Sequence, residues 1–220
     1  AGHEVFVSAP DRNNSAVSHK LTMREPVAVK EVSPCEGVKA YAVAGSPADC
    51  VLIALCALNI KPDLVLSGIN DGQNTGSDVI YSGTVAGAME GAQNRLPSIA
   101  LSQRFSMHST PEEKTRLFLR DAKFTVDNLS AWKARAEEIE GVLNVNFPTG
   151  EITGIAICHA VRTHYNMGYR LGEEGYLMQF YPPEPMEGDG DIPKLKAGNV
   201  TLTPLKLNMT DTETLKRWSK

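Results

Sequence analysis

Side-chain oxygen atoms are concentrated in one polar, glycine-rich segment, residues 68–82. Asn70, Asp71, Asn74 and Asp78 supply its amide and carboxylate oxygens. Divalent cations such as Mg²⁺ and Mn²⁺ prefer oxygen ligands, usually a few from the protein and the rest from water. The spacing does not match the ligand pattern of an EF-hand loop. A divalent-metal site is therefore one interpretation, and ordinary turn formation, which favours the same residue types, is the other.

The same segment leads into a helix that is predicted to begin at Ser82-Gly83-Thr84. The first N–H groups of a helix have no intrahelical partner, and together with the helix dipole they can bind an anion such as phosphate. Two hydroxyl groups add donors, and glycine lets a phosphate approach the backbone closely. An ordinary helix cap with a turn glycine has the same sequence, so both interpretations stay open for these residues.

Ser15 ends a second polar segment, residues 11–15, and taken alone it is typical of a turn or a cap. The phosphate-loop pattern G-x-x-x-x-G-K-[ST] and the dinucleotide fingerprint G-x-G-x-x-G are both absent from the chain. Their absence argues against P-loop NTPases and against a Rossmann-like dehydrogenase or transferase.

The elements that must position these residues alternate between strands and helices. We expect strands at residues 4–8, 27–32, 38–44, 64–66, 98–101, 142–147, 152–161, 175–181 and 200–205, and helices at 47–59, 84–92, 112–132 and 212–218. In open α/β sheets, ligands bind beyond the carboxyl ends of the strands, and both polar segments follow predicted strands. The pattern therefore predicts an α/β fold with its site at that edge of the sheet.

Two of these helices carry more specific signals. Ser46 is a suitable cap, Pro47 suits the first helical position, and Asp49 lies near the positive end of the helix dipole. The helix at 112–132 has apolar residues at three- and four-residue steps, which predicts one buried face. The residues of that predicted face are Phe118, Ala122, Val126, Leu129 and Trp132.

Length and composition are those of a single globular domain: 220 residues, 42% hydrophobic and 22% charged. The net charge of −4 argues against a surface that binds a nucleic-acid duplex. No apolar run reaches the length of about 20 residues that crosses a membrane, and no signal peptide is apparent. The four cysteines form no C-x-x-C pair and are expected to be reduced and buried. We therefore expect a cytoplasmic protein.

The loop sequence from Ser67-Gly68-Ile69-Asn70 to Tyr81-Ser82-Gly83-Thr84-Val85-Ala86 closely resembles the signature of the stationary-phase survival protein SurE family, which consists of metal-dependent nucleotidases. Further stretches agree with that family in the same order. They are Ala9-Pro10-Asp11-Arg12-Asn13 with Ser15, Gly45-Ser46-Pro47-Ala48-Asp49-Cys50-Val51, Leu143-Asn144-Val145-Asn146-Phe147-Pro148 and Leu202-Thr203-Pro204-Leu205. The resemblance covers nearly the whole chain.

The resemblance implies a Rossmann-like three-layer core with a mainly parallel sheet and a C-terminal extension rich in β-hairpins. Residues 1–162 would form the nucleotidase core. Residues 163–220 would form the extension and a C-terminal arm used in self-association as a homodimer or homotetramer.

The resemblance also implies an activity, which is hydrolysis of nucleoside 5′- and 3′-monophosphates to nucleoside and phosphate, and in some members also of short polyphosphate. One divalent cation per subunit, Mg²⁺ or Mn²⁺, would serve as cofactor. Matching positions assign Ser15 and Asn70 as metal ligands. They assign Asn74, Ser82, Gly83 and Thr84 as phosphate contacts.

One departure from the family bears on catalysis. The family's other two metal ligands are adjacent aspartates in a Ser-Asn-Asp-Asp-Gly stretch after its first strand, and this stretch does not occur here. No catalytic residue is therefore assigned, and we expect that the first β-α unit is missing from the chain. The alternative is a non-catalytic nucleotide-binding or assembly member of the family that lacks the aspartate pair.

Overall fold

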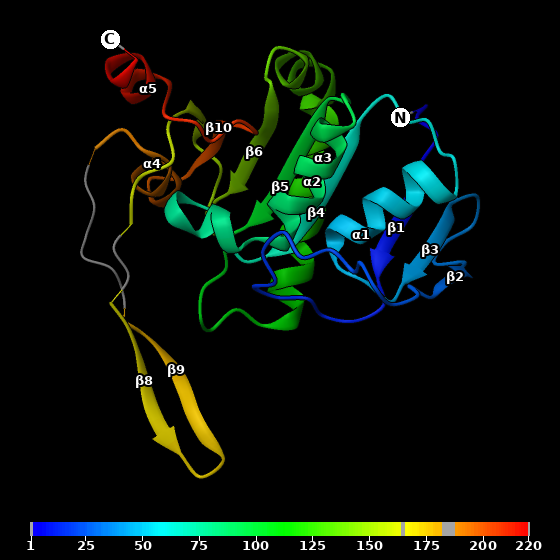
Figure 1. Cartoon of the computed structure of the whole chain (residues 1–220), viewed down its shortest axis with the longest axis horizontal. Helices are drawn as coiled ribbons and strands as arrows, with labels where there is room; N and C mark the ends of the chain where they lie inside the picture. Colours follow the sequence, from blue (N-terminus) through cyan, green and yellow to red (C-terminus); the bar gives the residue numbers. More distant parts are fainter. Residues whose placement is uncertain (1, 164–165, 182–187, 220) are drawn as a thin grey trace.

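The computed structural model describes residues 2–163, 166–181 and 188–219, and Figure 1 shows its elements. The strands are β1 (Phe6–Pro10), β2 (Val29–Val32), β3 (Lys39–Val43), β4 (Val65–Asp71), β5 (Ser98–Gln103), β6 (Gly141–Phe147), β7 (Gly154–Ile157), β8 (Asn166–Gly172), β9 (Gly175–Tyr181) and β10 (Asn199–Lys206). The helices are α1 (Pro47–Leu52), the π-helix η1 (Ile53–Ala57), the 3₁₀-helix η2 (Gly76–Tyr81), α2 (Gly83–Gln93), α3 (Pro111–Glu137), α4 (Asp191–Lys196) and α5 (Thr212–Trp218).

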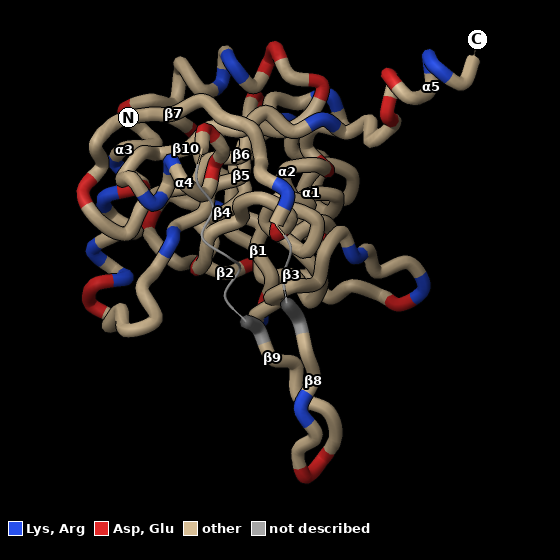
Figure 2. The backbone as a smooth tube through the Cα atoms, turned by 90° about the vertical axis from the view of Figure 1, so that its left-hand side faces the viewer, with Lys and Arg blue, Asp and Glu red and all other residues tan. Residues whose placement is uncertain are grey.

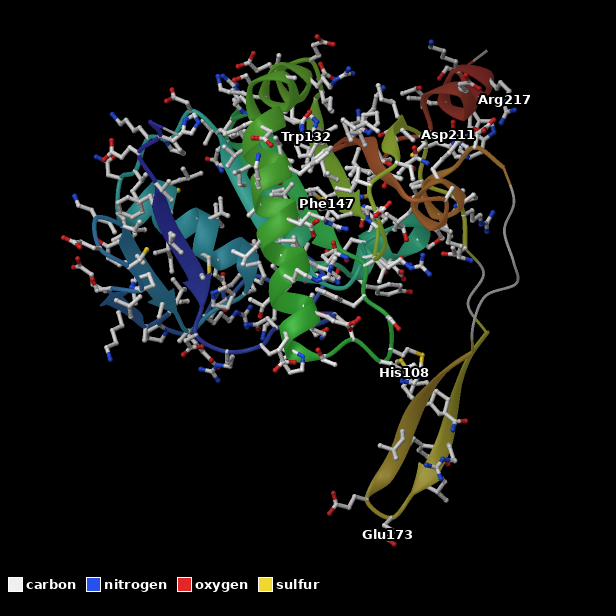
Figure 3. The ribbon with its side chains drawn as sticks, turned by 180° about the vertical axis from the view of Figure 1, so that it is seen from behind. His108, Trp132, Phe147, Glu173, Asp211 and Arg217 are labelled. Atoms are coloured by element: carbon white, nitrogen blue, oxygen red, sulfur yellow. The ribbon has the colours of Figure 1, made fainter. Side chains whose placement is uncertain are left out.

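The core sheet has the strand order β4-β5-β6-β10-β7. Strands β4, β5 and β6 are parallel, β10 is antiparallel to β6, and β7 is parallel to β10. Helix α2 covers one face in Figure 1, and α3 covers the other face in Figure 3, which is drawn from behind. This arrangement confirms the predicted three-layer α/β fold with a mainly parallel sheet.

Apolar side chains fill the space between the sheet and each helix. On the α3 side, Trp132 and Phe147 are both almost fully buried, with ring centroids 6.2 Å apart. On the α2 side, small residues let the helix lie close to the sheet. A Cβ at Gly91 would collide with Ser98 and Val65, so the glycine there sets the helix-to-sheet distance.

The two helical connections within the parallel part of the sheet have opposite hands. Ile99 and Leu143 face α3, whereas Ala100 and Val142 face α2. The chain steps in one direction through β4, β5 and β6, yet α2 crosses on one face and α3 on the other. One of the two connections therefore departs from the right-handed rule for parallel strands.

A second sheet of three strands, in the order β1-β3-β2, lies beside the core sheet (Figure 1). Strand β1 is parallel to β3, and β2 and β3 form the antiparallel pair expected for residues 27–44. Within the described residues, β1 pairs only with β3 and β4 only with β5, so each sheet ends in an open edge. Helix α1 contacts both α2 and β1 and connects the two sheets.

Helix α3 buries Trp132 as the sequence predicts, but another part of the predicted face is turned away from the core. Ala122 and Val126 are exposed, whereas Asp121 and Thr125 are buried. The buried polar groups have local partners, because Arg120 donates to Asp121 Oδ1 and Thr125 Oγ1 donates to the Asp121 carbonyl. Hydrophobic spacing alone therefore assigned part of this face wrongly.

The C-terminal part of the chain has two different roles in the fold. The hairpin β8–β9 projects away from the body of the molecule in Figures 1 and 2. Strand β10, in contrast, lies inside the core sheet between β6 and β7. The division into residues 1–162 and 163–220 stays a prediction, and the second segment also completes the core sheet.

The cysteines are all free, but they are not all buried. Cys50 and Cys158 are buried, and burial raises the pKa of the Cys50 thiol to about 12. Cys35 and Cys56 are exposed, so the expectation of burial is wrong for these two. Cys56 lies in η1, a π-helical turn that has no buried residue.

Basic and acidic residues are interspersed along the described chain, as Figure 2 shows in one view. No helix in the described ranges is both long enough and apolar enough to cross a membrane.

Candidate functional site

The end of β4 places Asn70 beside the start of α2. The pairing of β4 with β5 shifts register between Ser67 and Asn70, and such bulges re-aim side chains. Gly68 has φ +128° in this bulge, and a Cβ there would collide with the backbone of β5. Thr84 Oγ1 donates to Asn70 Oδ1 at 3.2 Å. A predicted metal ligand and a predicted phosphate contact are therefore neighbours.

The start of α2 is tightly enclosed. Ser82 is the N-cap, and its hydroxyl oxygen accepts from the Val85 N–H at 3.1 Å. A Cβ at Gly83 would come within 3.0 Å of Pro47 Cγ and 3.2 Å of Val17 Cγ2. Gly83 therefore lies between α1 and the segment that carries Ser15. A larger residue at this position would make close contacts with both of them.

The capping of α1 matches its prediction. Ser46 Oγ accepts from the Asp49 N–H, and Asp49 accepts from the Ser46 N–H at 2.9 Å, which forms a capping box. Asp49 also accepts from the Thr22 N–H and hydroxyl at 2.9 and 2.8 Å. Burial raises the pKa of Asp49, but hydrogen bonds from Thr22 and Ser46 outweigh it and hold the pKa below its usual value. This charge therefore anchors the loop at Thr22 to α1.

Asn74, within the polar loop, is 6% exposed. Its side-chain amide donates to Ser102 Oγ at 2.7 Å, and its N–H donates to Asn146 Oδ1 at 2.8 Å. Its carbonyl accepts from the amides of Asn144 and Asn146 at 2.8 and 3.2 Å. Asn74 therefore fastens the loop to the sheet, with its amide group already engaged by Ser102.

The far end of the loop is fixed by residues that the sequence did not single out. Asp191 is fully buried and accepts from the Gly76 N–H at 2.7 Å and from the Val161 N–H at 3.1 Å. Ser77 and Thr163 exchange three hydrogen bonds of 3.0 to 3.2 Å. The contacts of Asp191 with Gly76 and of Ser77 with Thr163 join residues that are 115 and 86 positions apart, so no local signal could have found them.

Ser15 lies on an exposed part of the loop between β1 and β2. The flanking residues fix this loop on both sides. Asn14 donates to the Gly45 carbonyl at 3.2 Å, and Ser18 donates its N–H to the Tyr81 carbonyl at 2.9 Å and its hydroxyl to the Ile80 carbonyl at 2.6 Å. The Ser15 segment therefore docks at the turn that precedes Ser82.

A hollow of about 780 Å³ lies at the carboxyl ends of β5 and β6. It is lined by residues of the segments 104–108, 148–153 and 195–198, and none of the predicted site residues lines it.

Comparison with known proteins identifies the family. The family model described as Survival protein SurE matches residues 1–167. The protein named 5′-nucleotidase SurE from Solidesulfovibrio magneticus is 38% identical over 223 residues, covering 96% of this chain and 84% of that protein. The chain belongs to the SurE family.

Other SurE proteins give the same result. The 5′-nucleotidase SurE of Methylocella silvestris is 35% identical over 228 residues, covering 99% of this chain and 88% of that protein. The crystal structure of the SurE protein from Aquifex aeolicus superposes with a TM-score of 0.70 at 33% identity. It covers 96% of this chain and 85% of the Aquifex chain. The fold and most of the chain length are therefore shared with the SurE family.

The oxygen groups of this SurE-family site have the chemistry that a divalent cation prefers, but those of Ser15 and Asn70 are neutral. In the described residues, no group of three or more His, Cys, Asp and Glu side chains could hold a metal. Asp71 pairs with Lys114 at 2.8 Å. Asp11 pairs with Arg12, whose hydrogen bond lowers the Asp11 pKa. The oxygen donors present therefore fit a divalent cation in type.

Proposed function

We propose that this chain is the main part of a divalent-metal-dependent phosphatase that hydrolyses nucleoside 5′-monophosphates to nucleoside and phosphate. The contact between Thr84 and Asn70 carries the proposal, because it joins a candidate metal ligand to a candidate phosphate contact. The names of the SurE relatives, 5′-nucleotidase, support the same reaction. Nucleoside 3′-monophosphates and short polyphosphate present the same phosphoryl group and are included in the proposal.

Each predicted site residue has a task in this proposal. Ser15 and Asn70 offer oxygens to one Mg²⁺ or Mn²⁺ ion, which when bound would polarise the phosphoryl group. The free N–H groups at Gly83 and Thr84 bind the phosphate oxygens and stabilise their developing charge. Ser82 caps that helix start through its hydroxyl oxygen, and its hydroxyl hydrogen is donated to the phosphate. Asn74 maintains the loop position through its contacts with the sheet and places a polar group near the phosphate.

Within the described residues, the unpaired edges of β1 and β4 support a position between these two strands for the two aspartates that the family motif has and these 220 residues lack. Strand β1 leads into the Ser15 segment, and β4 ends beside Asn70. A parallel strand between them would reach this edge of the sheet between Ser15 and Asn70. We propose that the aspartate pair of the SurE family is carried there by a β-α unit encoded upstream. Reading the upstream codons tests this directly, since a gene without such a stretch would contradict it.

The alternative is a nucleotide-binding or assembly protein of the same family without catalysis. Its supporting observation is the absence of the aspartate stretch from these 220 residues. Such a protein would bind a nucleoside monophosphate at the same helix start but would release no phosphate.

Self-association as a homodimer or homotetramer is also part of the proposal. The hairpin β8–β9 exposes Tyr169, Leu171 and Tyr176, and α5 exposes Trp218, each by more than 60%. Exposed apolar groups on projecting segments favour burial against another subunit. Sedimentation of the purified protein would show whether it is a monomer.

Phosphate release from 5′-AMP and 3′-AMP tests the function, with Mn²⁺ or Mg²⁺ present and then removed by chelator. We expect release that depends on the metal in the protein expressed from the complete gene. We expect loss of release in Asn70→Ala. Metal-independent release, or full activity of Asn70→Ala, would contradict the proposal, and nucleotide binding without release would favour the alternative.

A further inference from the structure

The Ser15 segment makes a second contact with α2, further along the helix than Ser82. His19 Nε2 lies 2.5 Å from Glu90 Oε1, and Val17 packs near Gly83. Gly83 and Glu90 are seven residues apart, which is about 10 Å along a helix axis. The segment therefore runs beside the first two turns of α2 and is fixed at both ends.

Glu90 depends on His19 for its pairing. Glu90 is 8% exposed, and within the described part of the chain His19 supplies its only hydrogen-bonding or ionic side-chain partner. A buried carboxylate without a partner is strongly unfavourable. The His19 side chain, in contrast, is 36% exposed and could be solvated without Glu90. The main effect of the His19–Glu90 contact is therefore to hold the loop that carries His19 against α2.

The loop itself has little regular structure to hold it. Ala16 and Ser18, on either side of Val17, both have φ of 55°. Residues other than glycine adopt this left-handed conformation rarely, and they keep it where surrounding contacts fix them. Ser15 directly precedes this stretch, so its position depends on the contacts that fix residues 16–19.

We propose that His19 and Glu90 form a latch that holds the Ser15 segment against α2, and that both are positioning residues for the metal and phosphate site. The second half of the proposal rests on the proposed function, in which Ser15 is a metal ligand. The first half concerns the loop alone and does not require activity.

Hydrogen exchange of the loop measures the latch directly. The variants are His19→Gln, Glu90→Gln and their combination, with His19→Lys as a rescue that places an ammonium group opposite Glu90. Lys20→Gln is the matched control, because Lys20 is an exposed residue of the same loop. We expect exchange of residues 12–20 to accelerate about tenfold or more in each single variant, with no further change in the double variant. We expect exchange close to the wild-type rate in His19→Lys and Lys20→Gln.

The Mn²⁺ concentration that half-activates 5′-AMP hydrolysis is the second measurement. Residues that orient a metal ligand typically change metal affinity by 10- to 100-fold when altered. We expect a rise of about tenfold in His19→Gln and Glu90→Gln, with recovery in His19→Lys. Unchanged loop exchange would overturn the latch. Faster exchange with unchanged Mn²⁺ dependence would overturn the positioning role. Absence of hydrolysis by the wild-type protein would contradict the proposed function, while loop exchange would still decide on the latch.

Discussion

Thr84 donates its hydroxyl to Asn70 Oδ1 over 3.2 Å, so the end of β4 and the first turn of α2 share a hydrogen bond. Asn70 also donates to the Gly72 carbonyl at 2.8 Å. Both polar groups of the Asn70 side chain are therefore oriented before any ligand binds. Pre-oriented groups need little rearrangement at the moment of reaction, which is the basis of electrostatic catalysis.

The first prediction concerns this contact. Thr84→Val keeps the shape of the side chain but removes the hydroxyl, and Thr84→Ser keeps the hydroxyl. A hydrogen bond between neutral groups contributes about 0.5–1.5 kcal/mol, which corresponds to roughly 2- to 10-fold in rate. We expect kcat/KM for 5′-AMP to fall by that factor in Thr84→Val and to change little in Thr84→Ser. Equal activity of the two variants would show that the hydroxyl has no role.

The second prediction separates the structural role of Ser82 from its proposed role at the phosphate. Removal of an N-cap side chain costs about 1 kcal/mol, whereas glycine at the cap costs only a few tenths. We expect the free energy of unfolding in urea to fall by about 1 kcal/mol in Ser82→Ala and by clearly less in Ser82→Gly. Both variants should lose affinity for inorganic phosphate alike, because both lack the hydroxyl. A phosphate affinity that follows stability instead of the hydroxyl would count against the contact.

Local chain geometry explains what the sequence could predict. The caps at Ser46 and Ser82 depend on residues within three positions, so their hydrogen bonds follow from sequence alone. The family motif likewise located Asn70 and Thr84, which the structure places in contact.

Long-range packing explains what the sequence could not predict. Asn144 and Asn146 alternate with apolar residues, a pattern typical of a strand with one solvated face, yet all of β6 is buried. The asparagines are buried because the carbonyl of Asn74, 70 or more residues away, accepts from both. The buried carboxylate of Asp191 depends on Gly76 in the same way. Such pairings arise only when the folded chain brings distant loops together.

The third prediction concerns pH and Asp121. Asp121 is fully buried, its Oδ2 has no partner within the described residues, and burial raises its pKa from 3.8 to about 6. A carboxyl group whose folded-state pKa is raised stabilises the fold fully below pH 3.8. That contribution is lost as pH rises through 6. A shift of about two units corresponds to roughly 3 kcal/mol.

Asp121→Asn removes this titration while nearly preserving the side-chain volume. We expect the unfolding free energy of the wild type to fall relative to that of Asp121→Asn between pH 4 and pH 7, by up to about 3 kcal/mol. Asp127→Asn is the matched control, because Asp127 is exposed on the same helix and pairs with Lys123. Urea unfolding at four pH values gives the comparison. Parallel curves for the wild type and Asp121→Asn would contradict the prediction.

The fourth prediction concerns a buried hydroxyl in the layer under the polar loop. Thr201 is fully buried in β10, and its hydroxyl has no hydrogen-bond partner in the part of the chain that the structure describes. An unsatisfied buried polar group costs about 1–3 kcal/mol, and replacing it by an apolar group of the same shape removes that cost. We therefore expect Thr201→Val to increase the free energy of unfolding by about 1 kcal/mol.

Thr125→Val provides the matched comparison, because Thr125 is also buried but donates its hydroxyl to the Asp121 carbonyl at 2.7 Å. Here the same substitution removes a satisfied hydrogen bond, so we expect the free energy of unfolding to fall by about 1 kcal/mol. Opposite signs for the two variants in urea unfolding would show that hydroxyl pairing, and not hydrophobicity, decides the outcome. A loss of stability in Thr201→Val as large as that in Thr125→Val would mean that a water molecule or another group satisfies the Thr201 hydroxyl. Thr201 would then add a hydrogen bond to those by which Asn74 fastens the polar loop to the sheet.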